Sequence, residues 1–251
     1  MKLSKLNIHK RDKRIEFYAE NHTYVIDKSK YDFISATTFI KKFFTPFDAD
    51  SFIQNLIDTN TFYKRYPNNT PENLKKEWND IGSNASKLGT LLHESIEYFY
   101  NEEHKESDIT ISKEWGLFTE FYQDHSHLIP YRTEWYVFTE RFKIAGSIDM
   151  VFKDKEDKYY IYDWKRSKQI KFNNKYQNAK NPISHIEDCN YYHYSLQLNL
   201  YKYILKHCYH INIYGMYLVI LHPNNETYKL IKISDLEFEI KQMLKYRFNV
   251  L

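Results

Sequence analysis

The segment 132–164 constrains the fold most, because it has the pattern of three consecutive β-strands joined by short turns. The strands are expected at 132–140, 144–153 and 158–164, with turns at 141–143 and 153–157. A helix follows over 190–206, and a strongly apolar strand over 211–221. A further strand at 228–233 and a helix at 235–248 end the chain. This order predicts an α/β fold with a mixed central sheet.

The N-terminal third is expected to be mostly helical, after a short hairpin over residues 15–27. Ser35 and Thr70 can cap a helix and mark two of the expected starts. The helices are expected from Ser35 to Phe43, from Asp48 to Phe62, from about Glu72 to Tyr100 with Gly82 as a point where it could be interrupted, and from Ser112 to His125. We expect one domain, 1–251, in which a helical extension, 1–80, packs on a catalytic core, 81–251.

Composition excludes several classes of protein. No apolar run approaches the roughly 20 residues of a membrane span, and the N-terminal 14 residues lack the apolar stretch of a signal peptide. Cys189 and Cys208 lack the spacing of metal ligands. These features predict an intracellular protein of a reducing compartment, the cytoplasm or nucleus, with no membrane partner.

The distribution of charge is more informative than the net charge of +3. Between residues 166 and 186 the chain carries no Asp or Glu and five cations, namely Arg166, Lys168, Lys171, Lys175 and Lys180. Such a run alone is more often a solvated loop than a binding site. The 24 Tyr and 17 Phe could stack on nucleic-acid bases, but an AT-rich genome explains most of them equally well.

The triplet Asp163-Trp164-Lys165 lies at the end of a predicted strand. Strand residues two apart share a face, so Asp163 and Lys165 are expected side by side. Asp149 on the preceding strand, after Gly146, brings a second carboxylate within reach. Carboxylates that hold Mg²⁺, with a lysine beside them, supply what phosphodiester hydrolysis needs. A strand-end salt bridge would explain the triplet alone equally well.

Two predicted helices add polar candidates. His93 lies at the margin of an apolar helix face, where a structural hydrogen bond is the commoner role. Glu97 shares its side of the helix, and a role on a metal is the less favoured interpretation for it. Gln197 and Tyr201 are four residues apart on one face of the later helix. Taken alone, they would be an ordinary polar flank.

Together, the ordered set His93, Gly146-x-x-Asp149, Asp163-x-Lys165 and Gln197-x-x-x-Tyr201 resembles the PD-(D/E)XK nuclease superfamily, in particular its RecB-like exonuclease branch. The similarity runs from about residue 80 to 221, and the segment 34–50 also resembles viral and phage members. Mitochondrial genome maintenance exonucleases are similar in the same motifs. The resemblance implies a restriction-endonuclease-like core, a mixed central sheet flanked by helices.

The resemblance also implies a role for each residue of the motifs. His93, Asp149, Asp163 and the backbone oxygen of Trp164 would bind Mg²⁺ or Mn²⁺, and Lys165 would position the attacking water. Contacts to DNA are expected from Gln197, Tyr201, Arg166, Lys168 and Lys171. Glu134 is a candidate acid supporting the metal, although a surface carboxylate is an equally good interpretation. Because the chain lacks a cysteine cluster, no iron–sulfur cluster is expected.

The site residues predict a metal-dependent nuclease, and the resemblance implies a DNA exonuclease acting in replication, repair or recombination. The residue bias and the segment 34–50 suggest a virus or another low-GC genome. The partner would be DNA, single-stranded or with free ends. Three alternatives stay open at this point: a catalytically inactive nucleic-acid-binding module of the same fold, a structural or interaction protein, and an endonuclease or RNA-directed nuclease.

Overall fold

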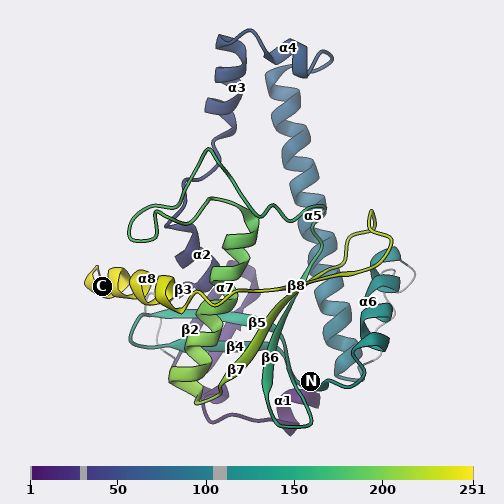
Figure 1. The fold of residues 1–251 in the computed structure, drawn as a ribbon, viewed down its shortest axis with the longest axis vertical. Coiled ribbons are helices and arrows are strands. Elements are labelled where there is room, and N and C mark those ends of the chain that lie inside the picture. The colour runs from purple at the N-terminus through teal and green to yellow at the C-terminus, as the bar shows by residue number, and fades with distance from the viewer. Residues whose placement is uncertain (1, 29–32, 104–111, 251) are drawn as a thin grey trace.

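A mixed six-stranded β-sheet flanked by helices forms the body of the protein in a computed structural model that describes residues 2–28, 33–103 and 112–250 (Figure 1). Its main path runs in the order β3-β5-β6-β7-β8, and β4 pairs with β5. The strands are β3 (Ile34–Ser35), β4 (Ile129–Thr139), β5 (Ile144–Lys153), β6 (Tyr159–Lys165), β7 (Ile213–Ile220) and β8 (Lys229–Lys232). The predicted α/β class with a mixed central sheet is therefore confirmed.

The direction of each strand follows from the connection that precedes it. Short turns join β4, β5 and β6, and these neighbours are antiparallel. Between β6 and β7 the chain crosses over through α7 (Asn190–Ile204), and these two strands are parallel. A parallel pair requires such a long crossover, whereas a hairpin turn suffices for an antiparallel pair.

Two apolar clusters cover the two faces of the sheet. The side chains of β6 alternate between them: Ile161 belongs to one cluster, while Tyr162 and Trp164 belong to the other. The first cluster includes α2 (Ala36–Lys41), α7 and α8 (Glu237–Asn249); the second includes α5 (Pro71–Tyr100) and α6 (Lys113–Asp124). The sheet is therefore packed against helices on both sides.

A helical projection stands out from the body (Figure 1). It consists of α3 (Ala49–Asp58), α4 (Phe62–Arg65) and the first half of α5. A small apolar cluster of its own holds these helices together, formed by Ile53, Leu56, Phe62 and Leu74.

The predicted capping roles of Ser35 and Thr70 are confirmed, and Asp48 and Ser112 also cap helices, but two helix lengths were not predicted correctly. The side chains of Ser35, Asp48, Thr70 and Ser112 accept hydrogen bonds from backbone N–H groups of the first turns. The helix expected from Asp48 to Phe62 is divided, because Asn60 takes a left-handed φ of 51° between α3 and α4.

The helix α5 runs without a break for 30 residues, so the interruption considered at Gly82 is absent. Packing of both ends of α5, one in the projection and one on the sheet, outweighs the weak helix propensity of a single glycine. The boundary expected at residue 80 therefore lies inside a continuous helix. No helix of the described ranges combines the length and apolarity required to cross a bilayer.

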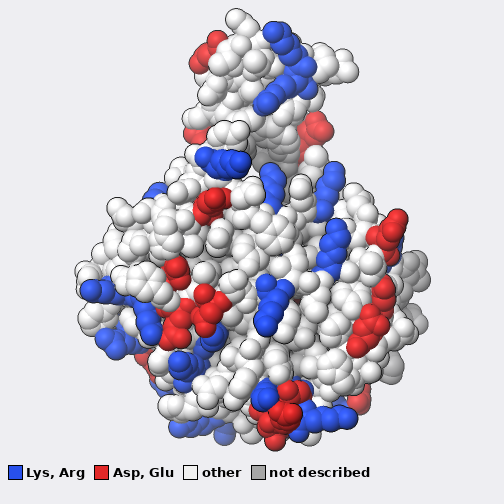
Figure 2. Space-filling model, viewed as in Figure 1, with Lys and Arg blue, Asp and Glu red and all other residues white. Residues whose placement is uncertain are grey.

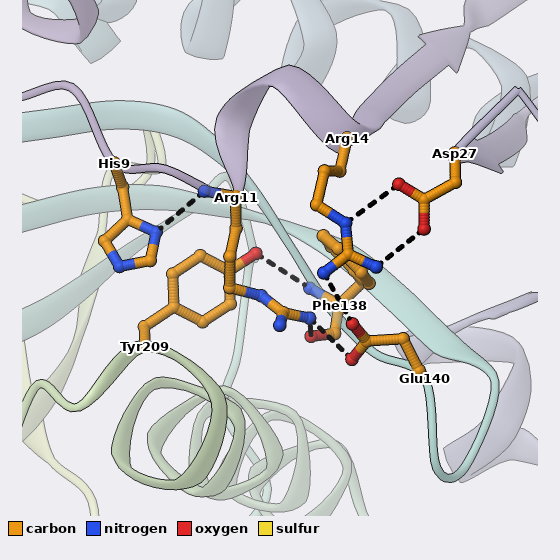
Figure 3. Close-up of polar contacts among 7 residues, drawn as sticks. All are labelled: His9, Arg11, Arg14, Asp27, Phe138, Glu140 and Tyr209. Atoms are coloured by element: carbon orange, nitrogen blue, oxygen red, sulfur yellow. Dashed lines mark hydrogen bonds and ion pairs between the residues drawn. The ribbon is translucent and has the colours of Figure 1, made fainter.

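The N-terminal segment is tied to the edge of the sheet by a network around two arginines (Figure 3). It contains α1 (Lys2–Leu6), two short 3₁₀ turns (Asp12–Arg14 and Ala19–Asn21), and the hairpin of β1 (Ile15–Tyr18) and β2 (Thr23–Ile26). The guanidinium of Arg11 donates to the Phe138 carbonyl at 3.2 Å and to Glu140 at 2.6 Å. Arg14 reaches the same carboxylate at 2.9 Å. This network fixes the N-terminal segment on the end of β4.

Beside this network, the Tyr209 hydroxyl accepts a hydrogen bond from the buried Phe138 N–H at 3.2 Å. Tyr209 ends a π-helical turn, η4 (Leu205–Tyr209), that follows α7. We expect Tyr209→Phe to lower the free energy of unfolding by about 1–3 kcal/mol, because the Phe138 N–H would stay buried without a partner. Urea denaturation measures this value.

The matched control is Tyr214→Phe, since the Tyr214 side chain is 61% exposed. It should leave the free energy of unfolding unchanged. Equal effects of the two substitutions would contradict a structural role for the Tyr209 hydroxyl.

Candidate metal and catalytic site

The site forms where β5 and β6 separate. Their ladder is regular from Lys153 with Tyr159 up to Met150 with Tyr162, while the beginning of β5 pairs with β3 instead. At the point of separation the Asp149 carboxylate accepts the backbone N–H of Trp164 at 3.0 Å. The Asp149 side chain thus replaces the next hydrogen bond of the β5–β6 ladder. It lies in the gap where the two strands separate, which we call the fork.

Glu134 enters the fork from β4. The pairs Thr133–Met150 and Trp135–Ile148 place Glu134 opposite Asp149. Its φ is 39°, in the left-handed region that a non-glycine residue in a strand rarely adopts. Ser147 donates to its carboxylate at 2.7 Å. Backbone strain of this kind concentrates at functional sites, where the surrounding structure holds it in place.

His93 reaches the same point from α5. Its Nε2 lies 2.9 Å from the Trp164 carbonyl, and because a carbonyl only accepts, Nε2 carries the proton. Its Nδ1 then faces Asp149 Oδ2 at 3.5 Å and Glu134 Oε1 at 3.7 Å. One ligand atom from each of His93, Glu134 and Asp149 lies within 4.8 Å of the others. These three donors fit a single divalent cation.

The electrostatics support a cation at this point. Burial by itself lowers the pKa of His93, but Asp149 and Glu134 outweigh it and raise that pKa to about 9. Without a proton on His93 Nδ1 or a cation between them, the two carboxylates and the imidazole nitrogen would direct only lone pairs toward one another. A proton on Nδ1 or a metal ion relieves this repulsion.

Asp163 and Lys165 form a buried ion pair next to this cluster. Burial and then the charge of Asp149 raise the pKa of Asp163 to about 7, against the effect of Lys165. Burial also disfavours the charged lysine, but Asp163 and Asp149 raise the pKa of Lys165 above its ordinary value. The ammonium also lies 5.0 Å from the centre of the Tyr194 ring, a cation–π contact. Lys165 is therefore held in place with its proton.

Tyr201 supports the fork from α7. Its side chain is 3% exposed, and Gln197 donates to its hydroxyl at 3.4 Å. A β carbon on Gly146 would lie 2.7 Å from that hydroxyl, closer than any real contact. Glycine at 146 is thus required by the close approach of Tyr201 to β5. Burial also raises the pKa of the Tyr201 hydroxyl.

The three basic residues expected to contact DNA differ in their surroundings. Arg166 donates to Glu114 of α6 at 2.8 Å, and both side chains are largely buried. Lys168 and Lys171 are exposed at the start of the segment between β6 and α7. Arg166 is thus committed to the fold, and the two lysines are open to solvent.

The structure brings together the predicted residues of the site. His93, Asp149, Asp163, Trp164, Lys165 and Glu134 all meet at the fork. Within this group Glu134 belongs to the three-residue ligand set, Asp163 is paired with Lys165, and the Trp164 carbonyl is engaged by His93. Burial and then Glu134 raise the pKa of Glu97, one helical turn from His93, to about 7.

Sequence reasoning missed Tyr194, whose ring contacts Lys165. It lies three residues before Gln197 on α7, so helical spacing could have placed it on the same face. It also missed Glu114 as the partner of Arg166. No local signal in the sequence connects those two residues, which lie 52 positions apart.

Comparison with known proteins adds little. No protein-family model and no curated protein matches the sequence. One similar solved structure is described as the crystal structure of SSO0001, with 13% identity over 88% of this chain and 78% of that chain and a TM-score of 0.35. This similarity is too low to assign a fold family or a function.

The contact between Gly146 and Tyr201 gives a test of the fork. We expect Gly146→Ala to lower the free energy of unfolding by about 1–3 kcal/mol, because the added carbon overpacks a buried contact. Chemical denaturation measures the change.

The same substitution at Gly82 is the control, because a β carbon there meets no atom within 4 Å. In a helix, Gly82→Ala should raise stability by about 0.5–1 kcal/mol. Two changes of the same sign would argue against tight packing at Gly146.

Proposed function

We propose that this chain is a metal-dependent DNA nuclease of the PD-(D/E)XK type, with a restriction-endonuclease-like core. One observation carries the proposal: Nδ1 of His93 faces the carboxylates of Asp149 and Glu134, directly beside the buried Asp163–Lys165 pair. A cation site next to a fixed lysine is the arrangement that phosphodiester hydrolysis requires. The order of the motifs in the sequence supports the RecB-like exonuclease branch.

The residues of the cluster would divide the work. His93, Glu134 and Asp149 would hold Mg²⁺ or Mn²⁺, which suits a set of oxygen donors with one imidazole. The metal would supply charge stabilisation for the reacting phosphate. Asp163 holds Lys165 in place, and a direct contact of Asp163 or of the Trp164 carbonyl with the metal remains part of the proposal.

Lys165 would act as a fixed positive charge and hydrogen-bond donor rather than as a base. Its pKa lies above the ordinary value, so it keeps its proton near neutral pH. A charged donor aimed at a phosphate oxygen or at the attacking water favours the transition state, in which negative charge increases. Lys168 and Lys171 are exposed just beyond the strand end and would contact the DNA backbone.

Activity on DNA tests the proposal directly. End-labelled linear DNA and closed circular DNA are incubated with Mg²⁺ or Mn²⁺, beside samples with EDTA. We expect loss of the linear substrate only, and only with metal, because the motifs match exonucleases. Lys165→Ala should slow the reaction by about 10²–10³-fold, the cost of removing one preorganised donor.

Lys155→Ala provides the matched control, since Lys155 is exposed in the turn between β5 and β6, at the end of these strands opposite the fork. It should cleave at the wild-type rate. Cleavage of the circular substrate would indicate an endonuclease instead of an exonuclease. Intact linear, circular, single-stranded and RNA substrates would refute the nuclease.

Metal binding can be measured without turnover. At about a hundredfold above its Kd, Mn²⁺ stabilises a protein by about 2.7 kcal/mol, which for this size raises Tm by roughly 5–10 °C. We expect this shift in the wild type and its loss in Asp149→Asn, which keeps an oxygen to accept the Trp164 N–H.

The control for metal binding is Asp157→Asn, at an exposed carboxylate paired with Lys153. Its Tm should rise with Mn²⁺ as in the wild type. An unchanged shift in Asp149→Asn would place the metal elsewhere.

A further inference from the structure

Two aromatic rings project from the segment between β6 and α7 into solvent. Phe172 is 54% exposed and Tyr176 is 100% exposed. Each follows directly after an exposed lysine, Lys171 and Lys175. Both rings are thus accessible to a partner, and each has a cation beside it in the chain.

The backbone that carries these rings is held in one conformation. Asn174 lies between them, and its N–H donates to Glu187 while its side chain donates to the Asp188 carbonyl at 2.6 Å. Asn190, the first residue of α7, accepts the Lys171 N–H at 2.8 Å. The backbone that carries the rings is thus preorganised, and a partner that binds there has less loop entropy to offset.

The surroundings of the rings are basic and polar. A hollow of about 570 Å³ lies beside Tyr176, lined by Lys171, Asn173, Asn174, Lys175, Tyr176, Asp188, Cys189, Asn190 and His193. Asp188, the acid in this lining, is paired with His193 at 2.8 Å. On the face in Figure 2, several Lys and Arg side chains lie along the middle of the body below the projection, with Asp and Glu clusters to their left and right and at the bottom.

A row of rings connects this surface with the fork. The Phe172 ring lies 4.9 Å from that of Tyr191, at the start of α7. Tyr194 follows three residues later on the same helical face. Its ring in turn lies 5.0 Å from Lys165 Nζ. Aromatic side chains therefore mark a path from Phe172 along α7 to the proposed catalytic lysine.

We propose that Phe172 and Tyr176 form a stacking platform for an unpaired nucleic-acid strand. Bases would stack on the two rings, and Lys171 and Lys175 would neutralise the phosphates between them. The strand would then follow Tyr191 and Tyr194 toward Lys165. This assignment of the substrate class rests on the proposed nuclease function. A duplex fits this surface less well, because its bases are already stacked and a ring can enter only by unstacking a base step.

Binding in EDTA tests the platform apart from catalysis. The probe is a fluorescently labelled oligothymidine, and its anisotropy is followed as protein is added. Tyr176→Ala and Phe172→Ala should each weaken binding about tenfold or more, the usual loss for one stacked base. Tyr176→Phe keeps the ring and should bind as the wild type does. A duplex of the same length should bind equally to all variants.

Phe238→Ala is the matched control, because Phe238 on α8 is 64% exposed and is flanked in the chain by Glu237 and Glu239 rather than by a lysine. Its affinity for oligothymidine should not change. Since Tyr176 is fully exposed, its replacement does not disturb folding, and the result is decisive even if Phe172→Ala loses stability with the Tyr191 contact.

A second probe separates stacking from charge. An abasic oligonucleotide of equal length keeps the phosphates and lacks the bases. The wild type should prefer oligothymidine to this probe, and the double variant Phe172→Ala/Tyr176→Ala should bind both equally. Oligouridine in the same assay shows whether the platform also takes the RNA sugar.

Wild-type affinity in both alanine variants would overturn the platform, and so would an equal loss for the abasic probe. The nuclease proposal fails separately, if the rings govern strand binding but no substrate is cut with Mg²⁺ or Mn²⁺.

Discussion

The hydrogen bond from the Trp164 N–H to Asp149 organises the site. It closes the fork at the point where the ladder between β5 and β6 ends. The same residue offers its carbonyl to Nε2 of His93, which turns Nδ1 back toward Asp149. Asp149, Trp164 and His93 thus contact one another in a closed cycle, although they come from two strands and a helix. Glu134 and the Asp163–Lys165 pair lie next to this cycle.

The price of gathering these groups is a high density of buried charge. Within the described residues, Asp149, Asp163 and Glu134 lie beside two cationic groups, His93 and Lys165, and the pKa values of Asp163 and His93 are raised. The left-handed backbone of Glu134 adds strain. Such a cluster does not favour stability by itself, because charges lose hydration when they are buried. A cation bound as proposed would offset the repulsion between these carboxylates and stabilise the folded chain.

Much of the framework could be predicted from local patterns. Alternation along β6 correctly indicated that Asp163 and Lys165 share a face, because strand geometry repeats every two residues. The capping residues Ser35 and Thr70 mark helix starts through bonds to their own first turns. The buried stripe of Leu196, Leu200 and Ile204 follows from helical periodicity. The order of the motifs suggested that His93 and Asp149 lie close to Asp163 and Lys165.

The sequence by itself therefore determined the elements, their caps and which residues share a face, because these depend on neighbours within a few positions. Only the tertiary structure decided that Glu134 joins His93 and Asp149, since this requires the register of β4 on β5 and one unusual φ angle. The tertiary structure also decided that Arg166 forms an ion pair with Glu114, and that α5 continues through Gly82. Contacts between residues distant in the chain depend on how whole elements pack, and no local pattern encodes them.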